Sequence, residues 1–117
     1  MSPLEHVELE QRGGVLVARV TGEVDLSNAT LVTDRLIEAT PNSATVLVLD
    51  LSDTSYLDSS GVRMLFELAQ RLRNRGQELQ LVVPEESNVR RVLLLTEVER
   101  VVPLSSYVEA AVGATNG

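Results

Sequence analysis

The hydrophobic pattern of this chain changes its period near the middle of the sequence. Residues 45–51 form a nearly unbroken aliphatic run, which is typical of a strand buried on both faces. After Gly61 the apolar residues recur at helical spacing with charged residues between them, and they predict an amphipathic helix over 60–74. The segment Tyr56–Val62 therefore joins a central strand to the start of a helix.

Strands and helices alternate in the rest of the pattern. The alternating run 7–11 and the largely apolar run 15–21 flank a glycine turn and predict an antiparallel hairpin. Further strands are expected at 78–83 and 100–104, and further helices at 29–39, at 88–96 and from about 105 onward. This order predicts an α/β fold with a mixed, mostly parallel sheet of four to five strands, an N-terminal antiparallel hairpin and four helices mainly on one face.

The length of 117 residues suits one domain with a single core. We expect one domain over residues 1–117, with its core at about 5–112 and a frayed tail at 113–117. The chain has no cysteine, which excludes disulfides, thiolate catalysis and most zinc sites. Because the sequence shows neither a signal peptide nor a run near the roughly 20 apolar residues of a spanning helix, we expect a cytoplasmic protein without membrane insertion.

The charge of the chain restricts its partners. The formal net charge is −7, so duplex DNA and anionic membranes would meet overall repulsion. One phenylalanine and two tyrosines, with no tryptophan, offer no platform on which bases could stack. The composition therefore argues against a direct nucleic-acid partner and favours a basic protein surface.

Polar residues follow three of the predicted strands, at Glu23–Asp25, Asp53–Gly61 and Pro84–Asn88. Because ligands of parallel sheets bind outside the carboxyl ends of the strands, we expect these segments to meet at one rim. Within this rim Ser59 or Ser60 can cap the following helix, whose start also favours an anion such as a phosphate on Ser59. Out of context, the tetrapeptide 58–61 is more often an ordinary helix cap than a functional site.

Three segments give the chain a family resemblance. They are Val20–Asp25, Leu49–Gly61 and Val89–Leu93, of which the middle one is the specific motif. With these segments the chain resembles the bacterial anti-sigma-factor antagonists of the STAS domain family over essentially its whole length. The resemblance implies that a partner that is both serine kinase and anti-sigma factor phosphorylates Ser59. It further implies partner switching, in which the unmodified antagonist binds the anti-sigma factor and the sigma factor is released. The phosphorylated antagonist dissociates from the anti-sigma factor, and a separate serine phosphatase returns it to the unmodified form.

The sequence departs from the family pattern at two places. Arg63 stands where the family often has a second glycine, and Thr96-Glu97-Val98 stands where the family commonly has Thr/Ser-Gly-Leu. The partner-binding rim is expected to contain Asp25, Asp58, Ser60, Gly61 and Arg63 beside Ser59. For Asp58 two roles stay open, which are holding the serine or a metal–nucleotide during phosphoryl transfer and capping the helix.

Other functions find less support in the residues. An enzyme with a serine nucleophile would need a base, yet the sole histidine is His6, and the chain has no glycine-rich phosphate loop, nucleophile elbow or metal-ligand cluster. We therefore expect no catalysis, no cofactor and no metal. Two alternatives keep the fold, namely a STAS subunit of a transporter or lipid-transport assembly and a nucleotide-binding sensor. Monomer and weak dimer both stay open.

Overall fold

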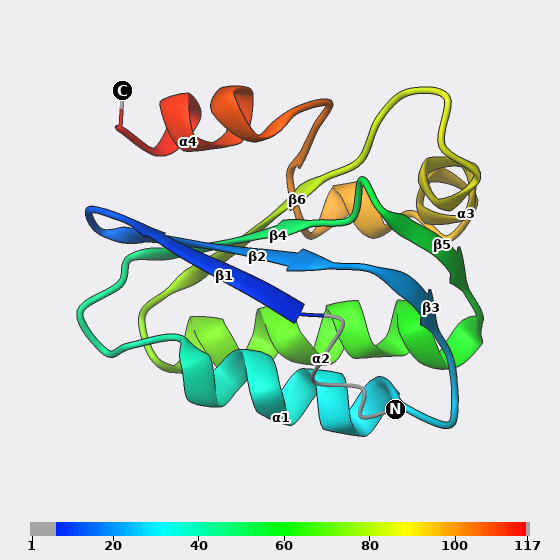
Figure 1. Cartoon of the computed structure of the whole chain (residues 1–117), viewed down its shortest axis with the longest axis horizontal. Helices are drawn as coiled ribbons and strands as arrows, with labels where there is room; N and C mark the ends of the chain where they lie inside the picture. Colours follow the sequence, from blue (N-terminus) through cyan, green and yellow to red (C-terminus); the bar gives the residue numbers. More distant parts are fainter. Residues whose placement is uncertain (1–6, 117) are drawn as a thin grey trace.

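A five-stranded sheet forms the centre of the protein (Figure 1). The computed structural model describes residues 7–116. In spatial order the strands are β1 (Val7–Arg12), β2 (Val15–Val20), β4 (Val46–Asp50), β6 (Glu78–Val82) and β7 (Leu104–Ser105). The first two strands pair antiparallel as a hairpin and all other neighbours are parallel. The predicted mixed, mostly parallel sheet with an N-terminal hairpin is confirmed.

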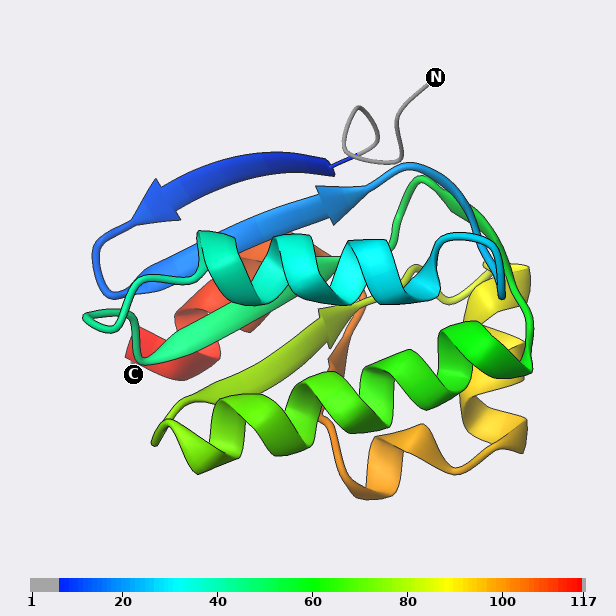
Figure 2. The same ribbon diagram turned by 90° about the horizontal axis from the view of Figure 1, so that it is seen from below.

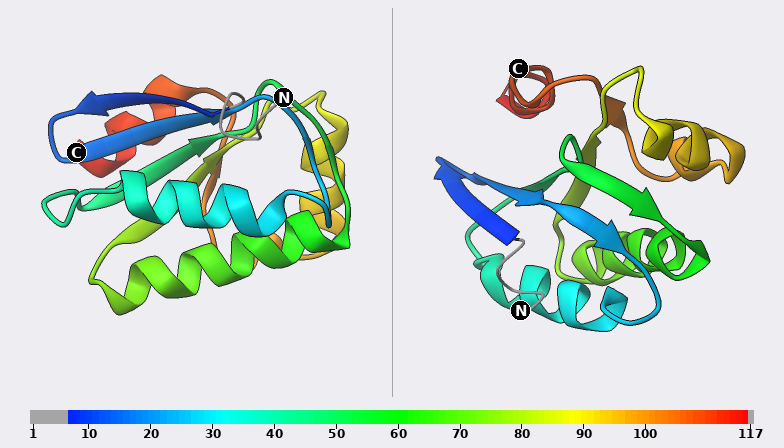
Figure 3. Two further views of the ribbon diagram at one scale, coloured as in Figure 1. Left: turned by 60° about the horizontal axis from the view of Figure 1, so that its bottom comes forward. Right: turned by 45° about the vertical axis from the view of Figure 1, so that its right-hand side comes forward.

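A second sheet, which the sequence analysis did not foresee, lies beyond the carboxyl ends of β2 and β4. It consists of β3 (Gly22–Val24) and β5 (Thr54–Leu57), which pair in parallel and lie side by side in Figure 3. Gly22 has a φ of 91°, which suits glycine, and its N–H donates to the Asp53 carbonyl at 3.0 Å. The residues between β4 and α2 are therefore partly a strand and not one continuous loop.

The helices cover both faces of the main sheet. Below it, α1 (Ala29–Ala39) and α2 (Ser59–Asn74) run side by side (Figure 2), and above it lies α4 (Val108–Asn116). The remaining helix, α3 (Asn88–Leu95), packs against β5. The expectation of helices mainly on one face thus fails for α4. The reason lies in β4, which is buried at all five positions and needs an apolar layer on each side.

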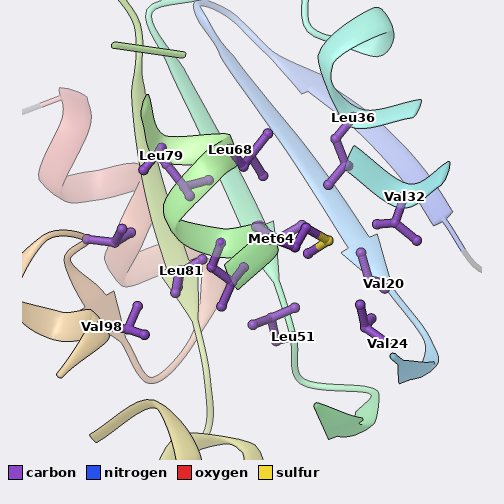
Figure 4. Close-up of a cluster of buried hydrophobic side chains, with 14 of the residues drawn as sticks. Val20, Val24, Val32, Leu36, Leu51, Met64, Leu68, Leu79, Leu81 and Val98 are labelled. Carbon is purple, nitrogen blue, oxygen red and sulfur yellow. The ribbon is translucent and has the colours of Figure 1, made fainter. Parts of the chain in front are cut away.

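The larger core lies between the sheet and helices α1 and α2 (Figure 4). From α2, Met64, Leu65, Leu68 and Leu72 are each at most 2% exposed. Full burial of such a side chain contributes about 1.5–3 kcal/mol. A smaller cluster on the opposite face joins Val46 and Val48 of β4 to Ala111 of α4, among others. The core fixes α2 along the sheet, and the beginning of this helix is thereby held next to β3 and β5.

The C-terminal quarter differs from the expected strand at 100–104. Val98 and Val102 are both buried, and this spacing of four suits a helical turn better than a strand, so a short 3₁₀ helix η2 (Val98–Arg100) forms and pairing is limited to β7. Glu97, at the position where the family commonly has glycine, adopts a left-handed conformation with φ 61°. Helix α4 begins at Val108, later than expected.

The tail from Gly113, expected to be frayed, has helical backbone through Asn116. Ala111 anchors α4 on the sheet and the helix continues for one more turn. Residues 5, 6 and 117, which the expected core and tail included, lie outside the described residues.

Candidate partner-binding site

The first turn of α2 is capped by Asp58. Its Oδ1 accepts a hydrogen bond from the Gly61 N–H at 3.0 Å, and its backbone carbonyl accepts from Val62 at 3.1 Å. The sequence left open whether a serine or the aspartate provides the cap, and the structure assigns it to the aspartate. Ser59 and Ser60 are then the first two helical residues, and their hydroxyls serve no cap.

Asp58 also joins the start of α2 to the loop before α1. Its second carboxylate oxygen, Oδ2, accepts from the Leu26 N–H at 3.1 Å, and its own N–H donates to the Val24 carbonyl at 3.3 Å. Two segments that are 32 residues apart in sequence are thereby held together by one side chain. The capping role of Asp58 is thus present in the structure, while its role in phosphoryl transfer stays a prediction.

The loop before α1 has its own hydrogen bonds. Asp25 Oδ1 accepts from the Ser27 hydroxyl at 2.5 Å and from the Ser27 N–H at 2.9 Å. Asn28 accepts from the Asp25 N–H and donates to the Glu23 carbonyl. The hydrogen bonds from Ser27 hold the pKa of Asp25 below its ordinary value, so this carboxylate stays charged well into the acid range. At the tip of this loop, Leu26 is 81% exposed.

Gly61, which the sequence analysis placed among the partner contacts, is buried. A Cβ at this position would lie 2.9 Å from the Val24 carbonyl oxygen and 2.9 Å from Leu57 Cδ2. Glycine therefore allows the helix to start directly against the two-stranded sheet. Gly61 is therefore closely packed beneath its exposed neighbours and is not itself part of the surface.

The residues around Ser59 form an exposed surface. Ser59 itself is exposed, and Ser60 and Arg63 line a groove between α1 and α2. On the other side of the helix start lies an open hollow whose lining includes Leu26 and the half-exposed Tyr56. We call Leu26, Tyr56, Ser59, Ser60 and Arg63 the Ser59 surface. It combines a modifiable hydroxyl with apolar side chains that a partner could bury.

Two members of this surface, Leu26 and Tyr56, are not among the site residues expected from the sequence, although Tyr56 lies within the expected rim segment Asp53–Gly61. For Leu26 a signal was present, because a single apolar residue between the turn formers Asp25 and Ser27 has no neighbour with which to reach a core. Tyr56 is exposed because it alternates with the buried Leu57 in β5, a strand that the sequence analysis did not include.

The expected third segment of the rim, Pro84–Asn88, lines neither the hollow nor the groove. Ser87 instead caps α3 by accepting from the Val89 N–H at 3.1 Å. Arg90 donates to the Val83 carbonyl at 2.7 Å and so holds α3 against the end of β6. These polar residues stabilise their own helix. The predicted rim residues that the fold brings together are Asp25, Asp58, Ser59, Ser60 and Arg63.

Neither a metal cluster nor a spanning helix is found in the described part of the chain. Within residues 7–116, no three His, Cys, Asp or Glu side chains are arranged to hold a metal ion. No helix over the same residues combines the length and the apolar character needed to cross a membrane.

The fold and the Ser59 surface define a known class of domain. The STAS domain family model matches residues 6–111, and the chain belongs to this family. It is 29% identical to the "Anti-sigma-F factor antagonist RsfB" of Mycobacterium tuberculosis, over 95% of this chain and 89% of that protein. The crystal structure of an anti-sigma factor antagonist from Mycobacterium paratuberculosis superposes with a TM-score of 0.83 at 26% identity, over 95% of this chain and 93% of that one.

A second kind of relative is a much longer protein, of which the match covers only a small part. The chain is 27% identical to the "Low affinity sulfate transporter 3" of Stylosanthes hamata over 101 residues, which cover 75% of this chain and 16% of the transporter. The resemblance to STAS-domain anti-sigma-factor antagonists, predicted from the motif around Ser59, is confirmed by the relatives that match over nearly the whole chain.

Proposed function

We propose that this protein is an anti-sigma-factor antagonist that works by partner switching in the cytoplasm. Its unmodified form binds an anti-sigma factor that is also a serine kinase, and phosphorylation of Ser59 ends this binding. The observation that supports the proposal most is that Ser59 is exposed at the start of a helix whose cap is Asp58, next to a groove that Leu26, Ser60 and Arg63 line. The names of the full-length relatives agree with this role.

The change in binding free energy that switching requires is large enough that Ser59 should lie inside the interface. A partner that changes from nearly all bound to nearly all free needs a difference of about 5.5 kcal/mol in binding free energy. Electrostatics at an exposed helix start provide only about 0.3–1 kcal/mol. The partner must therefore cover the serine, so that the added charge of about −1.5 to −2 is desolvated and obstructs packing.

The exposed apolar side chains give the partner something to bury next to this hydroxyl. Leu26 is 81% exposed and Tyr56 is 50% exposed, so a partner could cover most of the first side chain and half of the second. The Leu26 N–H donates to Asp58 Oδ2 at 3.1 Å, which holds the backbone at the tip of this loop. A loop backbone that is already held in place loses less conformational entropy on binding, which favours the complex.

The chemistry of the transfer belongs to the partner in this proposal. The γ-phosphoryl group of ATP passes to Ser59 Oγ, the serine proton passes to a base of the kinase, and ADP leaves. The described residues contain no histidine, because the sole one is His6. In this proposal the chain acts as a substrate and binding module, and a separate serine phosphatase hydrolyses the phosphate.

Substitutions at neighbouring hydroxyls test the proposal. Immobilised anti-sigma factor should retain the Ser59→Ala variant even with ATP, and it should retain the Ser59→Glu variant poorly. Ser60→Ala is the matched control, since it removes the adjacent hydroxyl and should still be phosphorylated and released. ATP-dependent release of Ser59→Ala, or phosphopeptide mapping that finds residue 59 unmodified, would contradict the proposal.

A second candidate is a STAS subunit that regulates a transporter assembly, which the similarity to the sulfate transporter favours. Affinity capture from the native cell separates the two. Recovery of a small ATP-binding kinase supports the antagonist role, and recovery of transporter subunits supports the alternative.

A further inference from the structure

Arg63 is the basic residue of the Ser59 surface. It is exposed, lies four residues after Ser59 in α2, and forms no ion pair within residues 7–116. Residues at positions i and i+4 of a helix are neighbours, and helical side chains lean toward the N-terminus. The guanidinium of Arg63 is therefore within reach of the turn that contains Ser59.

The other charges around this turn are negative. Asp58 precedes Ser59 directly, Asp25 lines the hollow beside it, and Glu67 lies one turn further along the groove. Arg63 is the one basic residue among those that line the groove and the hollow. A phosphate on Ser59 would thus meet repulsion from carboxylates on one side and a free guanidinium on the other.

We propose that Arg63 is an intramolecular receptor for the phosphate on Ser59. This inference rests on the proposed function, because it requires Ser59 to be the modified residue. The acidic group lies N-terminal to the basic one at i, i+4, which is the favourable orientation of such pairs. Arginine also binds phosphate in a bidentate manner, which lysine does not.

The pair has a consequence for switching. In the unmodified protein the guanidinium is free to face a partner across the groove. In the phosphorylated protein the same guanidinium is occupied by the phosphate. Modification then changes the interface twice, by adding a dianion and by withdrawing the nearest cation.

A protein made with phosphoserine at position 59 during synthesis tests this pair without any kinase. The phosphate is titrated by phosphorus NMR, and its second pKa lies near 6 in the absence of neighbours. Arg63 stabilises the dianion and so lowers this pKa. Removing it by Arg63→Ala should raise the phosphate pKa by about 0.3 units, which corresponds to one i, i+4 charge pair.

Arg73 provides the matched control. It lies on the same helix near its C-terminal end, is exposed and, within the described residues, forms no ion pair. Arg73→Ala should leave the phosphate pKa unchanged, and Arg63→Lys should give a value between those of the parent and Arg63→Ala. High salt should reduce the difference between the parent and Arg63→Ala.

Equal phosphate pKa values in the parent and in Arg63→Ala would overturn this inference, and so would an equal effect of Arg63→Ala and Arg73→Ala. Neither result would affect the proposed function, which fails if the kinase leaves Ser59 unmodified, if Ser59→Ala is still released with ATP, or if the phosphorylated protein stays bound. Thermal unfolding gives a second measure, because Arg63→Ala should lower the melting temperature of the phosphorylated protein more than that of the unmodified protein.

Discussion

Gly61 lets the start of α2 lie directly against the two-stranded sheet, and Gly61→Ala tests this arrangement. The added Cβ would lie 2.9 Å from the Val24 carbonyl oxygen and 2.9 Å from Leu57 Cδ2. The leucine tip can turn away, but the carbonyl oxygen belongs to β3 and already accepts a hydrogen bond from Asp58. Carbon and carbonyl oxygen normally approach to about 3.3 Å or more, so the helix start must shift.

The magnitude follows from two opposing effects. Overpacking of a tight contact costs about 1–3 kcal/mol, and alanine recovers about 0.5–1 kcal/mol relative to glycine in a helix. We therefore expect Gly61→Ala to lower the free energy of unfolding by about 1–2 kcal/mol. Gly113, in α4, has nothing within 4 Å of its would-be Cβ, so Gly113→Ala should instead raise it by about 0.5–1 kcal/mol.

Urea unfolding followed by circular dichroism measures both variants. The urea concentrations at the midpoints of unfolding should move in opposite directions for the two variants. The dependence of the unfolding free energy on urea concentration should stay the same. Capture by the anti-sigma factor should also weaken for Gly61→Ala, because the shift moves Ser59 relative to Leu26, and it should not change for Gly113→Ala. Equal stabilisation by both substitutions would refute the close approach of α2 to β3.

Substitutions at three further positions probe the loops of the site and of the C-terminal quarter. Asp58→Ala should lower the free energy of unfolding by about 2 kcal/mol, because it removes the cap and the bond to the loop before α1, while Asp58→Asn should cost less; urea unfolding compares them. Glu97→Gly should raise the melting temperature by relieving a left-handed conformation, for a gain of about 0.5–1 kcal/mol, and Glu97→Ala should not. Ser27→Ala should raise the pKa of Asp25 in a carboxyl NMR titration. Since a lowered folded-state pKa contributes stability that is lost as the pH falls through it, the parent should exceed Ser27→Ala in stability above that pH, and the two should converge in stronger acid.

Local patterns of sequence were sufficient for most of the elements. The aliphatic run at 45–51 and the helical spacing after Gly61 predicted β4 and α2 to within a residue or two of their observed ends, because each pattern has one period that suits only one element. The sequence pattern also placed Ser59 at a boundary between strand and helix, where its hydroxyl is exposed.

Tertiary contacts decided the remainder. The strands β3 and β5 are too short to show a period, and they exist because they pair with each other across 32 residues of chain. The burial of Gly61 and the exposure of Leu26 likewise depend on how α2 meets that pair, which no local pattern records. Periodicity along a chain reports which face of an element is apolar, and only the packing of distant segments determines which side chains remain for a partner to touch.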